Sequence, residues 1–303
     1  MAEIILHQYA TSPFSEKVRK VLAHKKVSWR SVDQPVIMPK PKLTPLTGGY
    51  RRIPVMQLGA DIYCDTGIIT RKLEELFPEP TIYPGGSEGL CQIISQWADR
   101  RFFFSITSAI FEKLVALEPK EFLEDRMKMM RGANITELLQ TAPDARSQLR
   151  AFLAMIDRQV SGQPFILGNA FSLADAACFH CLWFLRIEPA SFALAQRNGN
   201  LMRWFERLDA MGYGEVRPMD PDEALKIARA SQPSTRAVED PGDPNGLKPG
   251  MKVTVTPDDY GFDPVSGTVV ASSTWEIAIE REEPGLGKLV NHFPKVGFGV
   301  RAA

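Results

Sequence analysis

Residues 3–26, EIILHQYATSPFSEKVRKVLAHKK, place a short apolar run directly before an amphipathic segment. The run EIILHQYA predicts a strand, and Val18, Val21 and Leu22 fall on one face of a helix that carries its lysines elsewhere. The tetrapeptide Ser12-Pro13-Phe14-Ser15 stands where the strand ends and the helix begins. A strand that leads at once into such a helix is typical of an α/β domain.

The α/β pattern continues to about residue 82. VSWRSVDQP (27–35) predicts a second strand, and IPVMQLGADIYCD (53–65) predicts two strands joined at a Gly59-Ala60-Asp61 turn. GIITRKLEELF (67–77) predicts a closing helix, because its Ile and Leu residues share one face. We therefore expect residues 1–82 to form one α/β domain.

The rest of the chain divides into three further zones. Residues 88–232 carry long helical periodicities and almost no strand signal, which predicts an all-helical domain. Residues 233–246 are rich in proline and poor in apolar groups, as in a linker. Residues 247–303 alternate with period two in KVTVTP, GTVVASS, TWEIAIERE and LVNHFP, which predicts a small all-β module of the SH3-like barrel type. We expect this module to be separate and to dock on the helices.

Composition excludes several classes of partner. The 303 residues contain 36 basic and 36 acidic side chains, so no net charge favours nucleic acid or an anionic membrane surface. We find no apolar run near the ~20 residues that span a bilayer, and Glu3 interrupts any signal-peptide pattern. Four cysteines do not make a disulfide framework. These features predict a cytoplasmic protein that binds neither nucleic acid nor membrane.

Three short motifs in the first domain carry possible chemistry. A hydroxyl at the start of a helix, such as that of Ser12, can donate to a thiolate and lower the thiol pKa. A cis proline at Ile53-Pro54 would leave the Ile53 backbone free to pair with an extended peptide. Asp65-Thr66 offers a carboxylate for an ammonium group and a hydroxyl for a carboxylate. Each motif also has a structural interpretation, as a helix cap or a trans proline at a sheet edge.

In this order and spacing the three motifs resemble the glutathione transferase superfamily. Ser12-Pro13-Phe14-Ser15 is similar to the C-P-Y-C of glutaredoxins with both cysteines replaced by serine. The resemblance implies that Ser12 is the catalytic serine of a serine-type enzyme and that Phe14 belongs to the glutathione site. Arg52-Ile53-Pro54 matches the family's K-V-P, and Asp65-Thr66 matches the acidic-Ser pair that holds the γ-glutamyl end. For the glycine carboxylate of glutathione, Arg51, Arg52, Lys40 and Lys42 all stay candidates.

A fourth motif in the helical zone extends the resemblance to about residue 230. Ser172-Leu173-Ala174-Asp175 precedes an apolar helix and forms a capping box, a folding landmark of the transferase C-terminal domain. The resemblance therefore implies a thioredoxin-like domain followed by an all-helical one, usually in a homodimer. Cys178 and Cys181 in the same helix supply only two metal ligands, so we predict buried packing residues and no metal site.

Three functions are compatible with these observations. The first is a glutathione transferase, in which Ser12 stabilises the glutathione thiolate for attack on an apolar electrophile. The second is a non-catalytic glutathione-binding scaffold whose C-terminal module recruits a partner. The third, a glutathione-dependent thiol oxidoreductase, needs a nucleophilic cysteine at the helix start, and residues 9–19 contain none. We therefore expect the transferase, with glutathione as its co-substrate. We expect the C-terminal module to contribute nothing to the sulfur chemistry; a module docked on the helices could still cap the electrophile pocket.

Overall fold

The computed structural model describes residues 3–130 and 134–302. Its first part has the thioredoxin-like order that the sequence predicts, with four strands and three helices. Strand β1 leads directly into α1, and β3 and β4 form the expected hairpin at Gly59, which adopts a positive φ of 62°. The elements are β1 (Ile5–Gln8), α1 (Pro13–His24), β2 (Trp29–Asp33), α2 (Thr44–Thr47), β3 (Val55–Leu58), β4 (Asp61–Cys64) and α3 (Thr66–Leu76).

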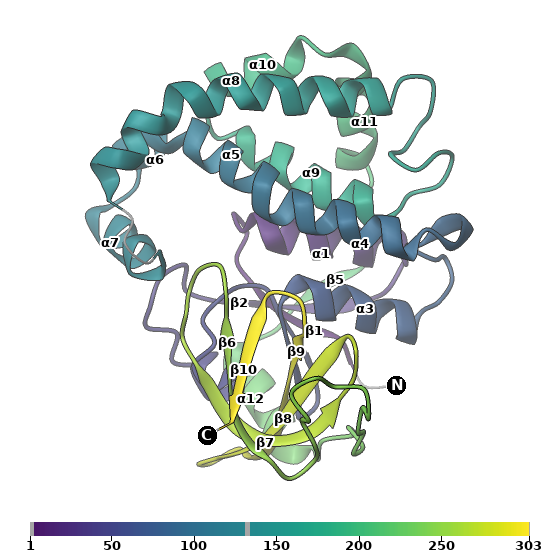
Figure 1. The fold of residues 1–303 in the computed structure, drawn as a ribbon, viewed down its shortest axis with the longest axis vertical. Helices are drawn as coiled ribbons and strands as arrows, with labels where there is room; N and C mark the ends of the chain where they lie inside the picture. Colours follow the sequence, from purple (N-terminus) through teal and green to yellow (C-terminus); the bar gives the residue numbers. More distant parts are fainter. Residues whose placement is uncertain (1–2, 131–133, 303) are drawn as a thin grey trace.

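The second part is helical, as predicted. The elements are η1 (Pro84–Gly86), α4 (Glu88–Trp97), η2 (Ala98–Phe102), α5 (Phe103–Ala109), α6 (Phe111–Leu117), α7 (Lys120–Met129), α8 (Ile135–Gln159), α9 (Leu173–Leu185), α10 (Pro189–Gln196) and α11 (Gly199–Asp209). The capping box is confirmed at the start of α9, where the Asp175 carboxylate accepts from Ser172 N–H at 2.9 Å. The same carboxylate accepts from Trp204 Nε1 of α11 at 2.8 Å and so joins two helices. Figure 1 shows α1 lying between these helices and the sheet.

After α11 the chain returns to the sheet, which the sequence did not predict. Strand β5 (Val216–Pro218) pairs in parallel with β2, and α12 (Pro221–Ala230) packs against β2. Met219 and Ala224 are buried in a small core with Ile5 and Val32. A strand of three exposed residues has too little apolar alternation to be recognised in the sequence.

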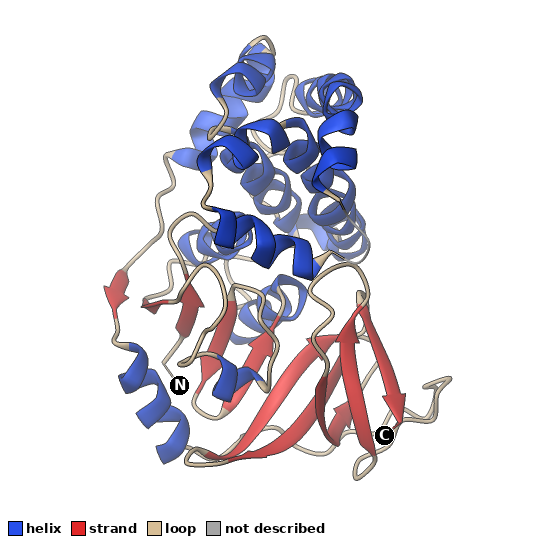
Figure 2. Ribbon diagram, turned by 90° about the vertical axis from the view of Figure 1, so that its left-hand side faces the viewer, coloured by secondary structure: helices blue, strands red, loops and turns tan. Residues whose placement is uncertain are grey.

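The C-terminal region is all-β, as predicted, but it is not detached from the first domain. Its strands are β6 (Lys252–Pro257), β7 (Val265–Ser272), β8 (Glu276–Glu283), β9 (Gly287–Pro294) and β10 (Phe298–Ala302). Strand β9 pairs in parallel with β4, so one ten-stranded sheet runs in the order β10-β6-β7-β8-β9-β4-β3-β1-β2-β5. Figure 2 shows these strands side by side on one side of the molecule and the long helices on the other. We refer to residues 247–302 as the C-terminal sheet.

One apolar core explains why the two regions join. Leu46, Val55 and Ile62 of the first domain are buried against Val255, Leu289 and other residues of the C-terminal sheet. These side chains are fully or almost fully inaccessible to solvent. A module of under sixty residues has only a marginal core of its own, so burial of its apolar side chains against the first domain stabilises it.

A buried histidine adds a polar link across the same junction. His292 of β9 lies between two carboxylates, with Nε2 3.2 Å from Asp61 Oδ1 on β4 and Nδ1 hydrogen bonded to Glu276 on β8. Its ring stacks on Tyr63 with centroids 4.2 Å apart. Burial lowers the pKa of His292, but the hydrogen bonds to Asp61 and Glu276 outweigh burial and raise it above the ordinary value.

The raised pKa predicts how this link responds to pH. A group with a raised folded-state pKa stabilises fully below its unfolded pKa, about 6.5 for histidine, and loses that contribution as pH rises through the folded value. We therefore expect His292→Gln to lower the melting temperature more at about pH 6 than at about pH 9. Thermal denaturation of both proteins at both pH values measures this difference. Equal losses at the two pH values would show that His292 is not charged in the fold.

Candidate functional site

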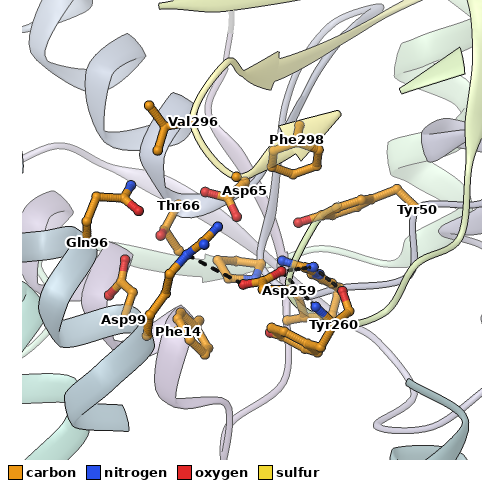
Figure 3. Close-up of a pocket in the computed structure, with 15 residues that line it drawn as sticks. Phe14, Tyr50, Asp65, Thr66, Gln96, Asp99, Asp259, Tyr260, Val296 and Phe298 are labelled. Carbon is orange, nitrogen blue, oxygen red and sulfur yellow. Dashed lines mark hydrogen bonds and ion pairs between the residues drawn. The ribbon is translucent and has the colours of Figure 1, made fainter. Parts of the chain in front are cut away.

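A small cavity lies where the first domain, the helices and the C-terminal sheet meet. Its volume is about 40 Å³, and its walls come from the start of α1, the segment before β3, the start of α3, the α4–η2 segment and two turns of the C-terminal sheet (Figure 3). Six residues predicted to bind glutathione line it: Phe14, Arg52, Ile53, Pro54, Asp65 and Thr66. The further lining residues are Tyr50, Gln96, Asp99, Arg100, Asp259, Tyr260, Val296, Gly297 and Phe298.

Ser12 occupies the helix start next to this cavity but is not among its described lining residues. It is the N-cap of α1, and its hydroxyl oxygen accepts the Ser15 N–H at 3.2 Å. Its side chain is buried, with a relative exposure of 1%. The structure thus shows the capping interaction of Ser12 and places its neighbour Phe14 in the cavity wall.

The Ile53-Pro54 peptide bond is cis, and both residues line the cavity. Asp65 caps α3, and its Oδ1 accepts the Gly67 N–H at 2.8 Å. Its backbone has φ 102°, a value that non-glycine residues rarely adopt and that is found mostly where surrounding contacts fix the chain at a functional site. Burial raises the pKa of the Asp65 carboxyl, against the opposing effects of the Gly67 N–H and Arg52.

A buried charge network that the sequence did not reveal lies under Thr66. Lys17 Nζ donates to Thr66 Oγ1 at 3.3 Å, to Ser95 Oγ at 2.7 Å and to Asp99 Oδ2 at 2.5 Å. His180 Nε2 lies 3.0 Å from the second Asp99 oxygen. Burial raises the pKa of Asp99, but the Lys17 ammonium and His180 outweigh it and keep the pKa below its usual range. The network joins α1, α3, α9 and the helical segment around residue 99.

Lys17 was expected on the exposed face of α1, yet its side chain is inaccessible to solvent. Asp99 lies in a π-helical stretch, Ala98–Phe102, where one extra residue per turn changes the direction of the side chains. Neither feature follows from the spacing of apolar residues. A lysine buried on a helix between two domains carries no sequence signal until its acidic partner is known.

The C-terminal sheet contributes a wall of the cavity, so it takes part in the site although none of the three motifs lies in it. Arg52 forms an ion pair with Asp259 and also donates to the Tyr260 carbonyl oxygen. Its guanidinium carbon lies 4.0 Å from the centroid of the Tyr260 ring, a cation–π contact. Arg100 of the helices pairs with Asp258 at 2.7 Å. Two basic residues at the cavity are thus held by acidic residues of the β6–β7 connection.

Of the four candidates for the glycine carboxylate of glutathione, Arg52 is the one that the described cavity wall includes. Arg51 pairs with Asp125, Lys40 donates to the Pro35 carbonyl oxygen, and Lys42 pairs with Asp222.

The four cysteines, Cys64, Cys91, Cys178 and Cys181, are free thiols and all are buried. Burial raises the pKa of the Cys64, Cys178 and Cys181 thiols, which keeps them protonated and unreactive. Among residues 3–130 and 134–302 no group of three or more His, Cys, Asp or Glu side chains is placed to hold a metal ion. Across the same ranges, none of the helices combines the length and apolar character needed to cross a membrane.

Comparison with known proteins gives matches over both of the first two regions. A family model for the glutathione S-transferase N-terminal domain matches residues 6–81, and one for the C-terminal domain matches residues 96–207. None of the curated proteins compared with the chain matches it.

Solved structures extend this result to the whole chain. A GST-like protein from Pseudomonas syringae is 34% identical, with a TM-score of 0.79 and full coverage of both chains. A glutathione S-transferase from Rhodospirillum rubrum F11 is 19% identical with a TM-score of 0.56, and the match covers 68% of this chain and 88% of that one. Glutathione transferase GSTFuA3 from Phanerochaete chrysosporium is 19% identical with a TM-score of 0.57, covering 70% and 98% of the two chains. Because the two domain models span more than half of the chain and the Pseudomonas protein aligns throughout, the chain belongs to the glutathione S-transferase family.

Proposed function

We propose that the chain is a glutathione transferase that binds glutathione at the cavity beside α1 and stabilises its thiolate for attack on an apolar electrophile. One observation carries this proposal. Six residues that three separated sequence motifs assign to glutathione, from Phe14 to Thr66, converge on one cavity next to the N-terminus of a helix. Such a terminus favours a bound anion through its unpaired N–H groups and dipole.

In this proposal Ser12 stabilises the sulfur. A hydroxyl can accept one hydrogen bond and still donate its proton, and the Ser12 oxygen accepts the Ser15 N–H. Donation of that proton to a thiolate favours the charged form and lowers the thiol pKa. Once the sulfur is ionised, it is the nucleophile for a carbon electrophile.

The remaining motif residues hold the peptide part of glutathione. The Ile53 backbone would pair with the central cysteine of the tripeptide, as an added strand pairs with a sheet edge. The Asp65 carboxylate would accept from the γ-glutamyl ammonium group. Thr66 accepts from Lys17, so its hydroxyl proton is available for the γ-glutamyl carboxylate.

The electrophile would lie on the apolar side of the same site. Phe14 packs edge-to-face against Phe103 with ring centroids 4.8 Å apart. The ring centroids of Phe104 and Tyr260 are 6.3 Å apart. Aromatic rings with exposed faces bind flat apolar molecules. Phe104 is 37% exposed and therefore accessible to such a molecule.

The alternative is a glutathione-binding scaffold without turnover. The observation in its favour is the C-terminal sheet, which supplies five of the described residues that line the cavity of about 40 Å³. Steady-state turnover of a panel of apolar electrophiles separates the two functions, because a scaffold binds glutathione and converts none of them. For a thiol oxidoreductase the chain lacks an accessible thiol among its four cysteines.

We also propose a homodimer and a cytoplasmic location. Leu90 and Ile93 of α4 are 50% and 68% exposed and give the helical face an apolar surface for a second copy. Sedimentation at the mass of a single 33.8 kDa chain would exclude the dimer. The buried, unpaired cysteines fit a reducing compartment.

Glutathione binding is tested by removing the charge of Asp65. We expect Asp65→Asn to weaken binding by about tenfold to a hundredfold, because a hydrogen bond between charged groups becomes one to a neutral amide. Asparagine keeps the side-chain oxygen that caps α3, so the fold is preserved. Titration calorimetry of both proteins with glutathione measures the change.

A matched control is Asp61→Asn, which changes a buried carboxylate that faces His292 instead of the cavity. We expect it to lower stability and leave the dissociation constant for glutathione unchanged. Equal affinity of the Asp65→Asn protein and the parent would remove Asp65 from the site.

A further inference from the structure

The two basic side chains among the described cavity residues are both engaged by the β6–β7 connection. Asp259 pairs with Arg52, whose side chain is only 7% exposed, and its second oxygen lies 3.9 Å from Arg100 Nε. Asp258 pairs with Arg100 at the surface, where the two side chains are 50% and 39% exposed. Figure 3 shows Asp259 and Tyr260 inside the ring of lining residues, with dashed lines from Asp259 to its partners. A carboxylate of the chain itself therefore occupies the cation best placed for a carboxylate of the ligand.

The cavity is too small for a tripeptide. Its 40 Å³ accommodates about three water molecules, whereas sites for ligands of glutathione's size measure at least ~300 Å³. Glutathione can fill the cavity only if part of the wall moves. Of the fifteen described lining residues, seven belong to the first domain, three to the helices and five to the C-terminal sheet.

Residues 258–264 are the part of the wall that we expect to move. They connect β6 to β7 without secondary structure of their own. The Arg52–Asp259 and Arg100–Asp258 ion pairs and the Phe104–Tyr260 ring contact hold them over the site, together with backbone hydrogen bonds. Gly261 N–H donates to the Met129 carbonyl oxygen at 2.7 Å, Asp258 N–H donates to the Gly297 carbonyl oxygen at 3.0 Å, and Tyr260 packs on Arg52. Asp259 makes the one buried ion pair among these contacts.

We propose that Asp259 is a built-in competitor for the ligand carboxylate at Arg52 and determines whether the site is open. With Asp259 on Arg52, residues 258–264 cover the cavity. Glutathione binds when its glycine carboxylate replaces Asp259 on the guanidinium and the segment moves away. This inference rests on the proposed function, because it takes the cavity to be the glutathione site.

The C-terminal sheet would then serve to hold residues 258–264 over the cavity. The matches to the two transferases from Rhodospirillum rubrum and Phanerochaete chrysosporium cover only 68% and 70% of this chain, whereas the Pseudomonas protein matches it throughout. The region carrying Asp259 is thus shared over the full-length match. If residues 258–264 must move first, the measured affinity for glutathione equals the affinity of the open site reduced by the free energy of moving this segment.

The test is calorimetric titration of glutathione into the full-length protein and its Asp259→Asn and Asp258→Asn variants. Asparagine retains the oxygen that accepts from Arg52 and from Tyr260 N–H but removes the charge that holds the guanidinium. We expect Asp259→Asn to lower the dissociation constant for glutathione about tenfold or more. The Asp259 carboxylate and the glutathione carboxylate compete for Arg52, and coupling free energies between two binding events are typically of this size. Asp258→Asn, with its exposed ion pair, should change the constant by less than about twofold.

A second measurement uses the unmodified protein. Amide hydrogen exchange at Gly261 reports whether its bond to Met129 is broken. We expect saturating glutathione to accelerate exchange there, because the segment leaves its position. An Asp259→Asn protein with unchanged or weaker affinity, or exchange at Gly261 that glutathione slows, would overturn the inference.

These outcomes are distinguishable from failure of the proposed function. If glutathione binds to neither the parent nor the Asp259→Asn protein, the cavity is not a glutathione site. If the parent binds glutathione, Asp65→Asn weakens that binding and Asp259→Asn does not strengthen it, only the competition at Arg52 is wrong.

Discussion

Replacement of Ser12 by alanine is expected to lower the rate of glutathione conjugation by about 100-fold or more, with little change in glutathione affinity. Removal of one aligned donor to a developing or full negative charge has effects of this size in enzymes. The donor acts on the sulfur, whereas Asp65 and Thr66 hold the other end of the tripeptide. The loss should therefore fall on kcat, measured with a panel of apolar electrophiles at saturating glutathione.

Loss of the helix cap is a separate consequence of the same substitution. Ser12 accepts the Ser15 N–H, and its removal should cost about 1 kcal/mol of stability. The matched control is Ser15→Ala, which removes a second buried serine hydroxyl from the same turn. A rate that falls equally in both variants would mean that the effect comes from α1 and not from the Ser12 hydroxyl.

Removal of the C-terminal sheet after Gln232 is expected to leave a chain that is insoluble or only partly folded. The truncation exposes Leu46, Val55 and Ile62, which are buried against the deleted strands. It also leaves β4 as an unpaired edge, which favours aggregation. Deleting even one buried leucine side chain costs about 2–5 kcal/mol, so the loss of a whole core exceeds the stability of an ordinary domain. Solubility and thermal denaturation of the truncated chain measure the result.

Two point variants distinguish the loss of buried apolar contacts from the effect of shortening the chain. Leu289→Ala creates a cavity in the shared core and should lower the melting temperature clearly. Val296→Ala changes a side chain that is 54% exposed and should leave stability unchanged. A truncated chain that is soluble, cooperatively folded and equal to the parent in glutathione affinity would instead establish the separate module that the sequence predicted.

Much of the fold could be predicted from the sequence because its elements are local. α1, α3 and the β3–β4 hairpin each follow from apolar spacing and turn residues within some ten positions. Strand β10 and the pairing of β9 with β4 do not follow from local sequence. Which strand pairs with a sheet edge depends on the side chains that the pairing buries, and these lie far apart in the chain. Period two in residues 247–303 predicted strands correctly but could not show that their apolar faces are covered by Leu46 and Ile62.

The candidate site also has one part that the sequence predicts and one part that it does not. Phe14, Ile53, Pro54 and Asp65 lie in motifs whose spacing is set by one small domain, and the structure brings them to one cavity. Lys17 and Asp99 are 82 positions apart, and Arg52 and Asp259 are 207 apart. Ion pairs of this kind depend on tertiary contacts alone. No periodicity or motif marks either partner.

The most direct test of the account is the pKa of the glutathione thiol when bound to the full-length protein, followed through the ultraviolet absorbance of the thiolate. We predict saturable binding and a bound thiol pKa well below the value of about 8.5 for a free cysteine thiol. In the Ser12→Ala protein the pKa should return toward that value. Bound glutathione that titrates like the free thiol, or no saturable binding to either the parent or the Asp259→Asn protein, would contradict the assignment of this cavity as a thiolate-stabilising glutathione site.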